Sequence, residues 1–124
     1  MNLVDSSGWI EYFADEENAD FFAEPIQQTN QLIVSAINIY EVFKHVLREE
    51  NRSKANQAIA YMRQARLIEL DIALAIEAAE TSHQLKIPMA DSLILTTARA
   101  HQALLWTQDV DFKGIDGVRY IKKA

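Results

Sequence analysis

The chain has 124 residues, of which 49% are apolar, so it is long enough for one domain with its own hydrophobic core. It contains no cysteine, which excludes disulfides, zinc–thiolate sites and thiol nucleophiles and fits a reducing compartment. Its formal net charge of -6 argues against a nonspecific nucleic-acid coat protein, but not against a nuclease that gathers carboxylates around a metal ion.

No segment has the composition of a signal peptide or a membrane span. The N-terminus enters an apolar run directly, and no uncharged stretch approaches the ~20 residues of a spanning helix. We therefore expect a soluble cytoplasmic protein with no membrane partner.

Short apolar runs alternate with helical patterns in the first half of the chain. Residues 2–5 predict a strand, and "WIEYF" begins a helix capped by Ser6 or Ser7. Residues 15–28 continue helically, and Pro25 is expected to mark a bend or an end. The compact run "QLIVSA" is typical of a buried parallel strand. It is followed by the helical patterns "INIYEVFKHVLREE" and "SKANQAIAYMRQA".

The second half repeats the alternation. "RLIELD" predicts a strand, "IALAIEAAETSHQLK" a helix, and Pro88 can open the helix "MADSLILTTARAHQ" as its first residue. "ALLWTQ" and "VRYIKK" predict two more strands, separated by the turn "DFKGIDG". Strands that alternate with helices imply right-handed crossovers, so the prediction is a single domain over residues 1–124: a three-layer α/β/α fold with a mostly parallel sheet of about five strands.

Acidic residues occur where the ligand site of such a fold is expected, beyond the carboxyl ends of the strands. Asp5 closes the first strand, Glu41 lies on the helix after the second, and Asp109 and Asp111 follow the strand "LLWT". Each has an ordinary structural alternative: a turn residue for the aspartates, and a solvated helix face for Glu41.

Asp91 is the least ordinary of these acids. It lies in line with an apolar helix stripe, because Ile94, Leu95 and Ala98 follow it at i+3, i+4 and i+7. A carboxylate in line with a buried stripe is costly unless it binds something, although the nearby helix N-terminus could also stabilise it. The position predicts a functional carboxylate.

Convergence of these acids would require a cation. Carboxylates within ~4 Å repel by a few kcal/mol per pair at an effective dielectric near 20. The expected ligands are all hard oxygens, without cysteine or paired histidines, which favours Mg²⁺ or Mn²⁺ over zinc. Such ions can activate water and stabilise the charge that builds up on a phosphodiester during hydrolysis.

Four motifs in order resemble those of the PIN-domain family, in particular the VapC-type ribonuclease toxins of toxin–antitoxin modules. "LVDSSGWIEYF" is similar to the family's opening strand with Asp and a hydroxyl residue, and "LIVSAINIYEVF" to its strand with a helical Glu. "MADSLILTTARA" resembles the Ala-Asp pair that leads an apolar helix, and "LLWTQDVDF" the final strand with Thr and Asp. The resemblance extends over nearly the whole chain.

The resemblance implies a Mg²⁺- or Mn²⁺-dependent endoribonuclease. Asp5, Asp91 and Asp109 would hold the metal directly, and Glu41 would orient metal-bound water or act as a base. Asp111 is expected to cap the turn entering "FKGI" or to serve as an outer ligand. The hydroxyls that would support the metal's water shell or the phosphate belong to Ser6 and Thr107.

Family resemblance also implies three partners: an RNA substrate, a small cognate VapB-like antitoxin that covers the acidic groove, and a second copy of the chain in a homodimer. Basic side chains near Glu41 could bind RNA phosphates or form an ordinary solvated face. The candidates for RNA binding are Lys44, Arg48 and Arg52.

Two other classes of function remain open at this stage. A phosphoacceptor signalling domain, similar to the receiver domains of two-component systems, would use Asp71 with Thr107 and Lys122, but it lacks an acid pair at the first strand. Asp71 is expected instead to cap the helix that follows it. A non-catalytic interaction protein with the PIN fold is the second alternative, and the retention of all four acids argues against it.

Overall fold

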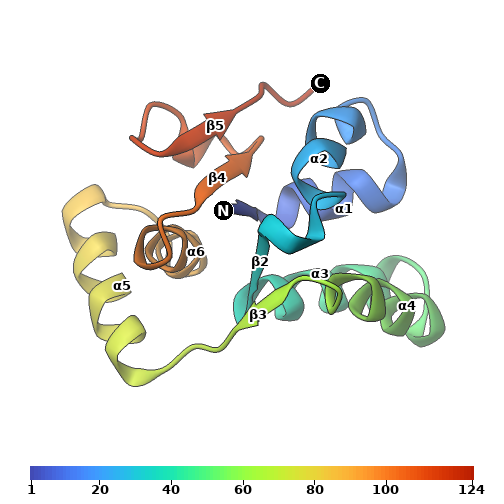
Figure 1. Ribbon diagram of the computed structural model, residues 1–124, viewed down its shortest axis with the longest axis horizontal. Helices are drawn as coiled ribbons and strands as arrows, with labels where there is room; N and C mark the ends of the chain where they lie inside the picture. The colour runs from blue at the N-terminus through green and yellow to red at the C-terminus, as the bar shows by residue number, and fades with distance from the viewer.

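The computed structural model describes residues 1–124 and has five parallel strands between two layers of helices (Figure 1). The sheet order is β3-β2-β1-β4-β5, and all four strand pairs are parallel. This confirms the predicted three-layer α/β/α class, with a sheet that is parallel throughout. In chain order the strands are β1 (Asn2–Val4), β2 (Leu32–Ser35), β3 (Arg66–Ile68), β4 (Leu104–Thr107) and β5 (Val118–Tyr120).

Six helices cover the two faces of the sheet. In Figure 1, α5 and α6 lie on one side and α1 to α4 on the other. Two short 3-10 turns, η1 (Thr29–Gln31) and η2 (Val110–Phe112), precede β2 and follow β4. The helices are α1 (Ser6–Ala14), α2 (Ala19–Ile26), α3 (Ala36–Glu49), α4 (Arg52–Met62), α5 (Ile72–Leu85) and α6 (Met89–Ala100). None of them combines the length and apolar character needed to cross a bilayer.

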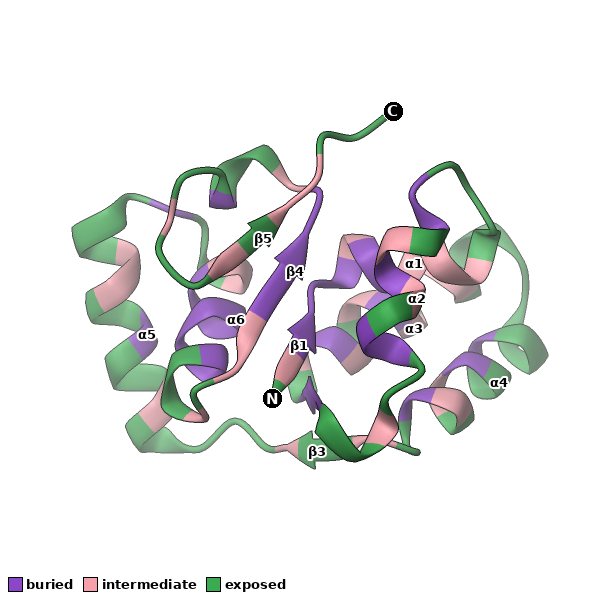
Figure 2. Ribbon diagram, turned by 45° about the horizontal axis from the view of Figure 1, so that its top comes forward, coloured by how far each residue is buried: buried purple, intermediate pink, exposed green.

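The core consists of two clusters, one on each face of the sheet. Consecutive strand residues point to opposite faces, so Leu3 joins the cluster under α6 while Val4 joins the one under α1 to α4. Leu105 and Trp106 divide in the same way on β4. The central strands are therefore buried on both faces, and Figure 2 shows most of β1 and β4 in the colour of buried residues. Burial on both faces explains why the sequences of these strands are apolar without alternation.

Local structure differs from the sequence-based prediction near the first helix. The expected continuous helix is broken at Asp15, which adopts a left-handed conformation with φ 53° and ends α1. Neither serine caps α1, because the helix begins at Ser6 and Asp5 holds the cap position without a side-chain cap bond. α6 likewise begins one residue later than expected, with Pro88 at its cap position.

Asp71 caps α5, as predicted. Its Oδ1 accepts a hydrogen bond of 2.8 Å from the backbone N–H of Leu74. The carboxylate is exposed and lies after β3, an edge strand of the sheet. Asp71 thus has a complete structural explanation.

Candidate metal centre

A pocket of about 350 Å³ lies at the carboxyl ends of the central strands and contains the four predicted catalytic acids. Asp5 comes from the end of β1, Glu41 from α3, Asp91 from the start of α6 and Asp109 from the segment after β4. Residues separated by up to 104 positions in sequence therefore meet, because β1 lies between β2 and β4 in the sheet. The acids meet at this edge because the carboxyl ends of parallel strands all lie on the same side of the sheet.

Asp5 is the most buried acid of the pocket, with 4% of its surface exposed. Its backbone N–H donates to Trp106 O at 2.9 Å and extends the β1–β4 ladder by one bond. Its Oδ2 accepts two hydroxyl bonds, from Ser7 at 2.7 Å and from Thr107 at 2.9 Å. Thr107 Oγ1 itself accepts from the N–H of Asp109 at 2.9 Å, so its own proton is committed to Asp5.

Burial raises the pKa of the Asp5 carboxyl from its usual 3.8 to about 6. The hydroxyl bonds from Ser7 and Thr107 oppose this shift by stabilising the anion, whereas the nearby charges of Asp109 and Glu41 reinforce it. The net effect is a carboxylate that gains from a neighbouring positive charge.

Asp91 has a higher pKa, about 7, although its side chain is only half-buried. Burial is again the largest cause, followed by the charges of Asp109 and Asp5. Asp91 lies in the first turn of α6, where the helix N-terminus favours an anion, but that effect is outweighed. Stabilisation by the helix N-terminus therefore does not account for Asp91, whose carboxyl lies beside other acids.

Three carboxylates are close enough to share one cation. Asp91, Asp109 and Asp111 each offer an oxygen, and these oxygens all lie within 4.8 Å of one another. Asp5 lies outside this group but beside it, since its charge raises the pKa of Asp91. Hard oxygens from three or four carboxylates fit Mg²⁺ or Mn²⁺. A cation there would relieve the repulsion that, after burial, contributes to the raised pKa values of Asp5 and Asp91.

The roles of Asp109 and Asp111 differ from the expectation in one respect. Asp109, not Asp111, caps the turn after β4: its Oδ1 accepts from the N–H of Asp111 at 2.9 Å. Of the two roles expected for Asp111, a turn cap or an outer metal ligand, the turn cap is therefore wrong. An aspartate two residues before a backbone N–H can close an Asx turn, and Asp109 has that spacing. The Asp111 side chain joins the carboxylate group instead.

Glu41 is held by a hydroxyl from another helix. Ser6 Oγ donates to Glu41 Oε1 at 2.7 Å, and Asn38 Nδ2 donates to Ser6 Oγ at 3.0 Å. Ser6 was expected to support a metal's water shell or a phosphate, but its proton is directed at Glu41. Sequence reasoning did not find Asn38 or Ser7; the one available signal for Asn38 was its spacing from Ser35, since Ser-x-x-Asn can form a capping box.

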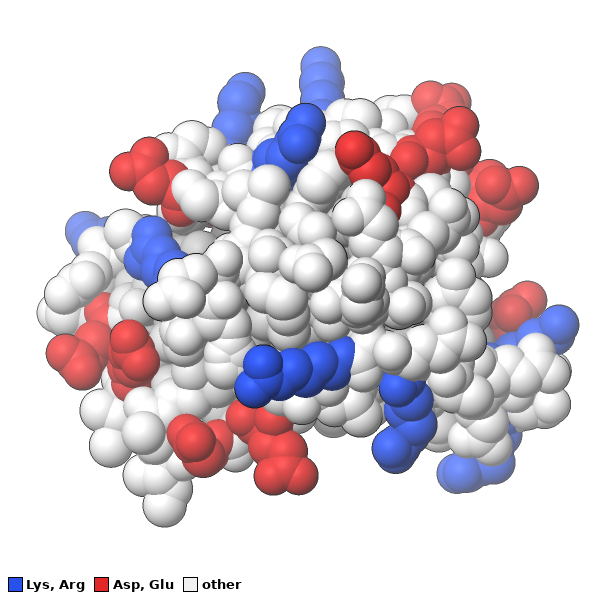
Figure 3. Space-filling view, viewed as in Figure 1, with Lys and Arg blue, Asp and Glu red and all other residues white.

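Two of the three predicted RNA-binding side chains line the acidic pocket. Lys44 and Arg48 are among its lining residues, together with His45, whereas Arg52 lies outside it and stacks over the Phe43 ring with 5.9 Å between its guanidinium carbon and the ring centre. Acidic and basic side chains are interspersed on the face of the molecule shown in Figure 3, with no extended patch of one sign there.

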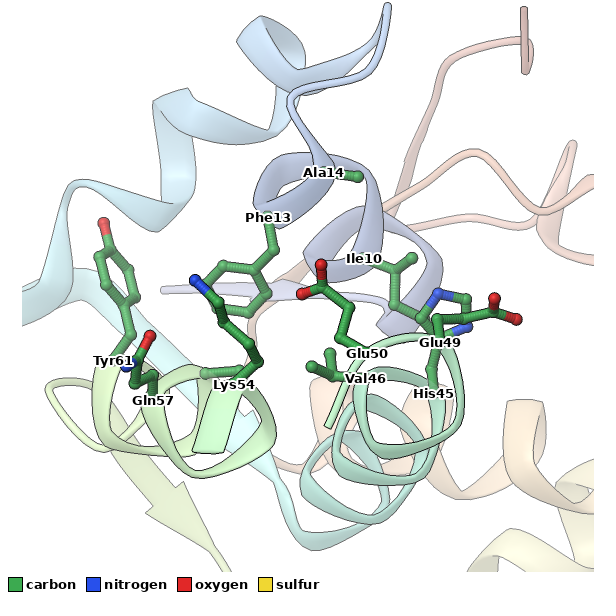
Figure 4. A pocket seen from close by; sticks show the side chains of 11 residues that line it. Ile10, Phe13, Ala14, His45, Val46, Glu49, Glu50, Lys54, Gln57 and Tyr61 are labelled. Atoms are coloured by element: carbon green, nitrogen blue, oxygen red, sulfur yellow. The ribbon is translucent and has the colours of Figure 1, made fainter. Parts of the chain in front are cut away.

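A second cavity, of about 680 Å³, lies between α1, α3 and α4 (Figure 4). Its apolar lining includes Phe13, Val46 and Tyr61, and Figure 4 shows acidic and basic side chains around them. Ile10 and His45 line both this cavity and the acidic pocket, so the two are neighbours.

Comparisons with known proteins agree with this architecture. A structure described as a toxin–antitoxin complex from Klebsiella pneumoniae has a TM-score of 0.80 at 24% identity, with 96% of each chain covered. VapC20 of Mycobacterium tuberculosis, described as a sarcin-ricin loop cleaving toxin, has a TM-score of 0.78 at 16% identity, with 94% of this chain and 95% of that chain covered. DNA-bound VapBC from Salmonella typhimurium has a TM-score of 0.75 at 15% identity, with 98% of each chain covered.

At these identities the structural similarity establishes the fold alone. No curated protein matches the sequence significantly. The sequence does match the family described as PIN domain, over residues 3–118. This match includes both core clusters and all four acids of the pocket, and on this evidence the chain belongs to the PIN-domain family.

Proposed function

We propose that this protein is a metal-dependent endoribonuclease and acts as the toxin of a toxin–antitoxin module. The observation that supports it best is the meeting of Asp5, Glu41, Asp91 and Asp109 in one pocket of a PIN-domain chain. Acids that repel one another in this way are difficult to explain as a structural feature, because they destabilise the metal-free fold.

The donor set fits Mg²⁺ or Mn²⁺. Asp91, Asp109 and Asp111 would hold the ion together with Asp5, whose Oδ1 makes no hydrogen bond within the protein. When bound, the ion would supply a water of lowered pKa and charge stabilisation for the phosphodiester.

The protein's own groups would position the substrate and move the proton. Lys44 and Arg48 line the pocket and would bind RNA phosphates on either side of the bond to be cut. Glu41 would take the proton from the attacking water, because its Oε2 makes no hydrogen bond within the protein. Ser7 and Thr107 would hold the Asp5 carboxylate in place. The reaction would be hydrolysis that leaves a 5'-phosphate and a 3'-hydroxyl.

RNA is the proposed substrate because VapC20, which shares the fold, is described as cleaving the sarcin-ricin loop. The central experiment incubates the purified chain with an RNA pool in Mg²⁺ or Mn²⁺. We expect cleavage that EDTA abolishes and that Asp91→Asn reduces to background. Asp71→Asn is the matched control, since Asp71 is an exposed aspartate that caps α5 and belongs neither to the acidic pocket nor to the carboxylate group.

Cleavage that survives EDTA, or an Asp91→Asn variant as active as wild type, would refute the mechanism. Loss of phosphate-analogue binding in Asp71→Asn, with no effect of Asp91→Asn, would favour the phosphoacceptor alternative. Binding of RNA or of a protein without any cleavage would favour a non-catalytic PIN-domain protein.

An antitoxin is the proposed protein partner, supported by the similarity to toxin–antitoxin complexes and by the second cavity. An amphipathic segment could place apolar side chains against Phe13 and Val46 and a basic one toward the acids beyond Ile10. Co-expression with the product of a short neighbouring reading frame should give a complex that Val46→Glu disrupts. A complex of unchanged affinity would exclude this docking site.

Three further proposals rest on the sequence and on the resemblance to VapC-type toxins. We propose that the chain works as one domain over residues 1–124, that it forms a homodimer, and that it acts in the cytoplasm. Light scattering of the purified chain measures the mass in solution, and a monomer at micromolar concentration would contradict the dimer.

A further inference from the structure

Asn38 is a completely buried amide that connects two helices at the acidic pocket. It lies in the first turn of α3, and none of its surface is exposed. Its Oδ1 accepts from the backbone N–H of Ser35 at 3.0 Å, and its Nδ2 donates to Ser6 Oγ at 3.0 Å. Ser6 lies 32 residues away in sequence, at the start of α1.

The donor and the acceptor of each hydrogen bond in this series can be assigned. A backbone N–H can only donate, so the amide oxygen of Asn38 must face Ser35 and its NH₂ must face Ser6. Ser6 Oγ accepts from that NH₂, so its single proton is free to reach Glu41 Oε1, at 2.7 Å. The series of hydrogen bonds therefore has one direction: it starts at the backbone N–H of Ser35, passes through Asn38 and Ser6, and ends at the carboxylate of Glu41.

Glu41 needs such a restraint because other groups compete for it. Lys44 and His45, at i+3 and i+4 on the same helix, are the neighbours with which a helical glutamate commonly pairs. Asp5 and Glu41 line the same pocket, so their negative charges repel each other there. The Ser6 bond opposes both effects by fixing Glu41 to the start of α1.

We propose that Asn38 is a positioning residue of the nuclease, which acts through Ser6 to hold Glu41 toward the acidic pocket. Two adjacent serines thereby serve two different carboxylates: Ser7 donates to Asp5 and Ser6 to Glu41. The sequence of the first α1 turn thus orients two of the four acids. This inference rests on the proposed ribonuclease function.

The test variant is Asn38→Asp, which preserves size and the acceptor for Ser35 but removes the donor to Ser6. Without that donor, the Ser6 proton can turn to the new carboxylate and leave Glu41. We expect kcat to fall by about 10- to 100-fold, the usual range for residues that orient a metal-site group, with KM nearly unchanged. Asn51→Asp is the matched control, because it adds the same charge at the cap of α4 and preserves its bond to Lys54.

Ser6 provides a second variant that adds no charge. Ser6→Ala should lower kcat to a similar extent, and Ser6→Thr, which retains a hydroxyl, should restore most of it. If Asn38 acts through Ser6, kcat of the double variant Asn38→Asp/Ser6→Ala should fall no further than in the more impaired single variant. If the two residues act independently, the fold losses in kcat of the single variants should multiply. A multiplied loss, or an Asn38→Asp variant with wild-type kcat, would overturn the proposal.

Binding of Mn²⁺, measured by calorimetry, provides a readout apart from activity. Asn38→Asp and Ser6→Ala should bind Mn²⁺ with nearly wild-type affinity, because neither residue belongs to the carboxylate group, whereas Asp91→Asn should bind weakly. Weak Mn²⁺ binding by Asn38→Asp would show that the amide supports the metal site and not Glu41. Absence of RNA cleavage by the wild-type chain would instead refute the proposed function itself.

Discussion

Between about pH 4 and 6, the carboxyl groups of Asp5 and Asp91 stay protonated in the folded protein, although they would be ionised in the unfolded chain. The pKa of Asp5 is about 6 and that of Asp91 about 7, against 3.8 for an unperturbed aspartate. Well below pH 3.8 both groups are protonated whether or not the chain is folded, so they contribute nothing to pH dependence there. Above that pH the unfolded chain ionises first, and the folded state loses stability until the pH passes the folded pKa values.

Metal-free protein should therefore become less stable between pH 4.5 and 7.5 on account of these two residues. We expect Asp5→Asn to remove about 2 kcal/mol of that loss, from a shift of roughly two pKa units over this interval. Urea unfolding at both pH values with EDTA present measures the difference. The opposite sign, with the wild type gaining more stability than the variant as pH rises, would contradict the burial of Asp5 as an anion.

Asp5, Asp91 and Asp109 could be placed near one another from sequence because each lies close to a strand end or a helix start that the pattern predicts. Asp5 and Asp109 follow apolar runs, and Asp91 follows Pro88. The supporting amide of Asn38 could not be identified in this way. Its partner, Ser6, is close to it only in the folded chain, and no local pattern links positions 32 residues apart.

At the scale of elements, α1 packs so closely that only glycine fits at one of its positions. A Cβ at Gly8 would lie 2.5 Å from Phe22 Cδ1 and 2.7 Å from Val4 Cγ1. Both neighbours are completely buried, so neither can move away easily. The approach of α1 to β1 and α2 depends on this contact.

Gly8→Ala should destabilise the protein by about 1–3 kcal/mol through overpacking, despite the better helix propensity of alanine. The midpoint of urea unfolding measures this change. A midpoint equal to or above that of the wild type would mean that α1 can shift to accept a methyl group.

Asp71, the cap of α5, lies outside the acidic pocket, so its loss should affect stability but not activity. Asp71→Ala removes the side-chain acceptor for Leu74 at the start of α5 and should cost about 1 kcal/mol. RNA cleavage per folded molecule should not change, because Asp71 does not line the acidic pocket. Thermal unfolding and the cleavage assay test the two statements separately, and a loss of cleavage without a loss of stability would contradict the second.

Helix boundaries were less predictable than helix existence. The segment after Ala14 has helical composition, yet Asp15 takes a left-handed conformation that is uncommon outside glycine. The break lets α2 fold back so that Phe22 and Ile26 reach the same core cluster as Trp9. Tertiary packing, which local propensity does not encode, therefore decides where α1 ends.

At the scale of the whole molecule, the sheet order places the first strand, β1, beside β4, which is about 100 residues later in the sequence. β1 pairs with β4 in parallel register, with Val4 opposite Trp106. This pairing brings the acid after β1 next to the acids after β4, and all of them repel in the metal-free state. Cation binding should consequently stabilise the entire fold.

Mg²⁺ or Mn²⁺ at 100 times its dissociation constant should raise the free energy of unfolding by about 2.7 kcal/mol. Thermal unfolding with the metal, and again after EDTA, tests this. The shift should be much smaller in Asp91→Asn, which lacks one carboxylate of the group. An equal shift in the variant would place the stabilising ion elsewhere on the protein.

The β1–β4 pairing also has a consequence for synthesis of the chain. Asp5 is synthesised 102 residues before its hydrogen-bond partner Thr107, and Asp109 follows two residues later. A nascent chain cannot close the acidic pocket until β4 has been made and has paired with β1. If the proposed ribonuclease activity is correct, it can therefore appear only after β4 has emerged from the ribosome and paired with β1.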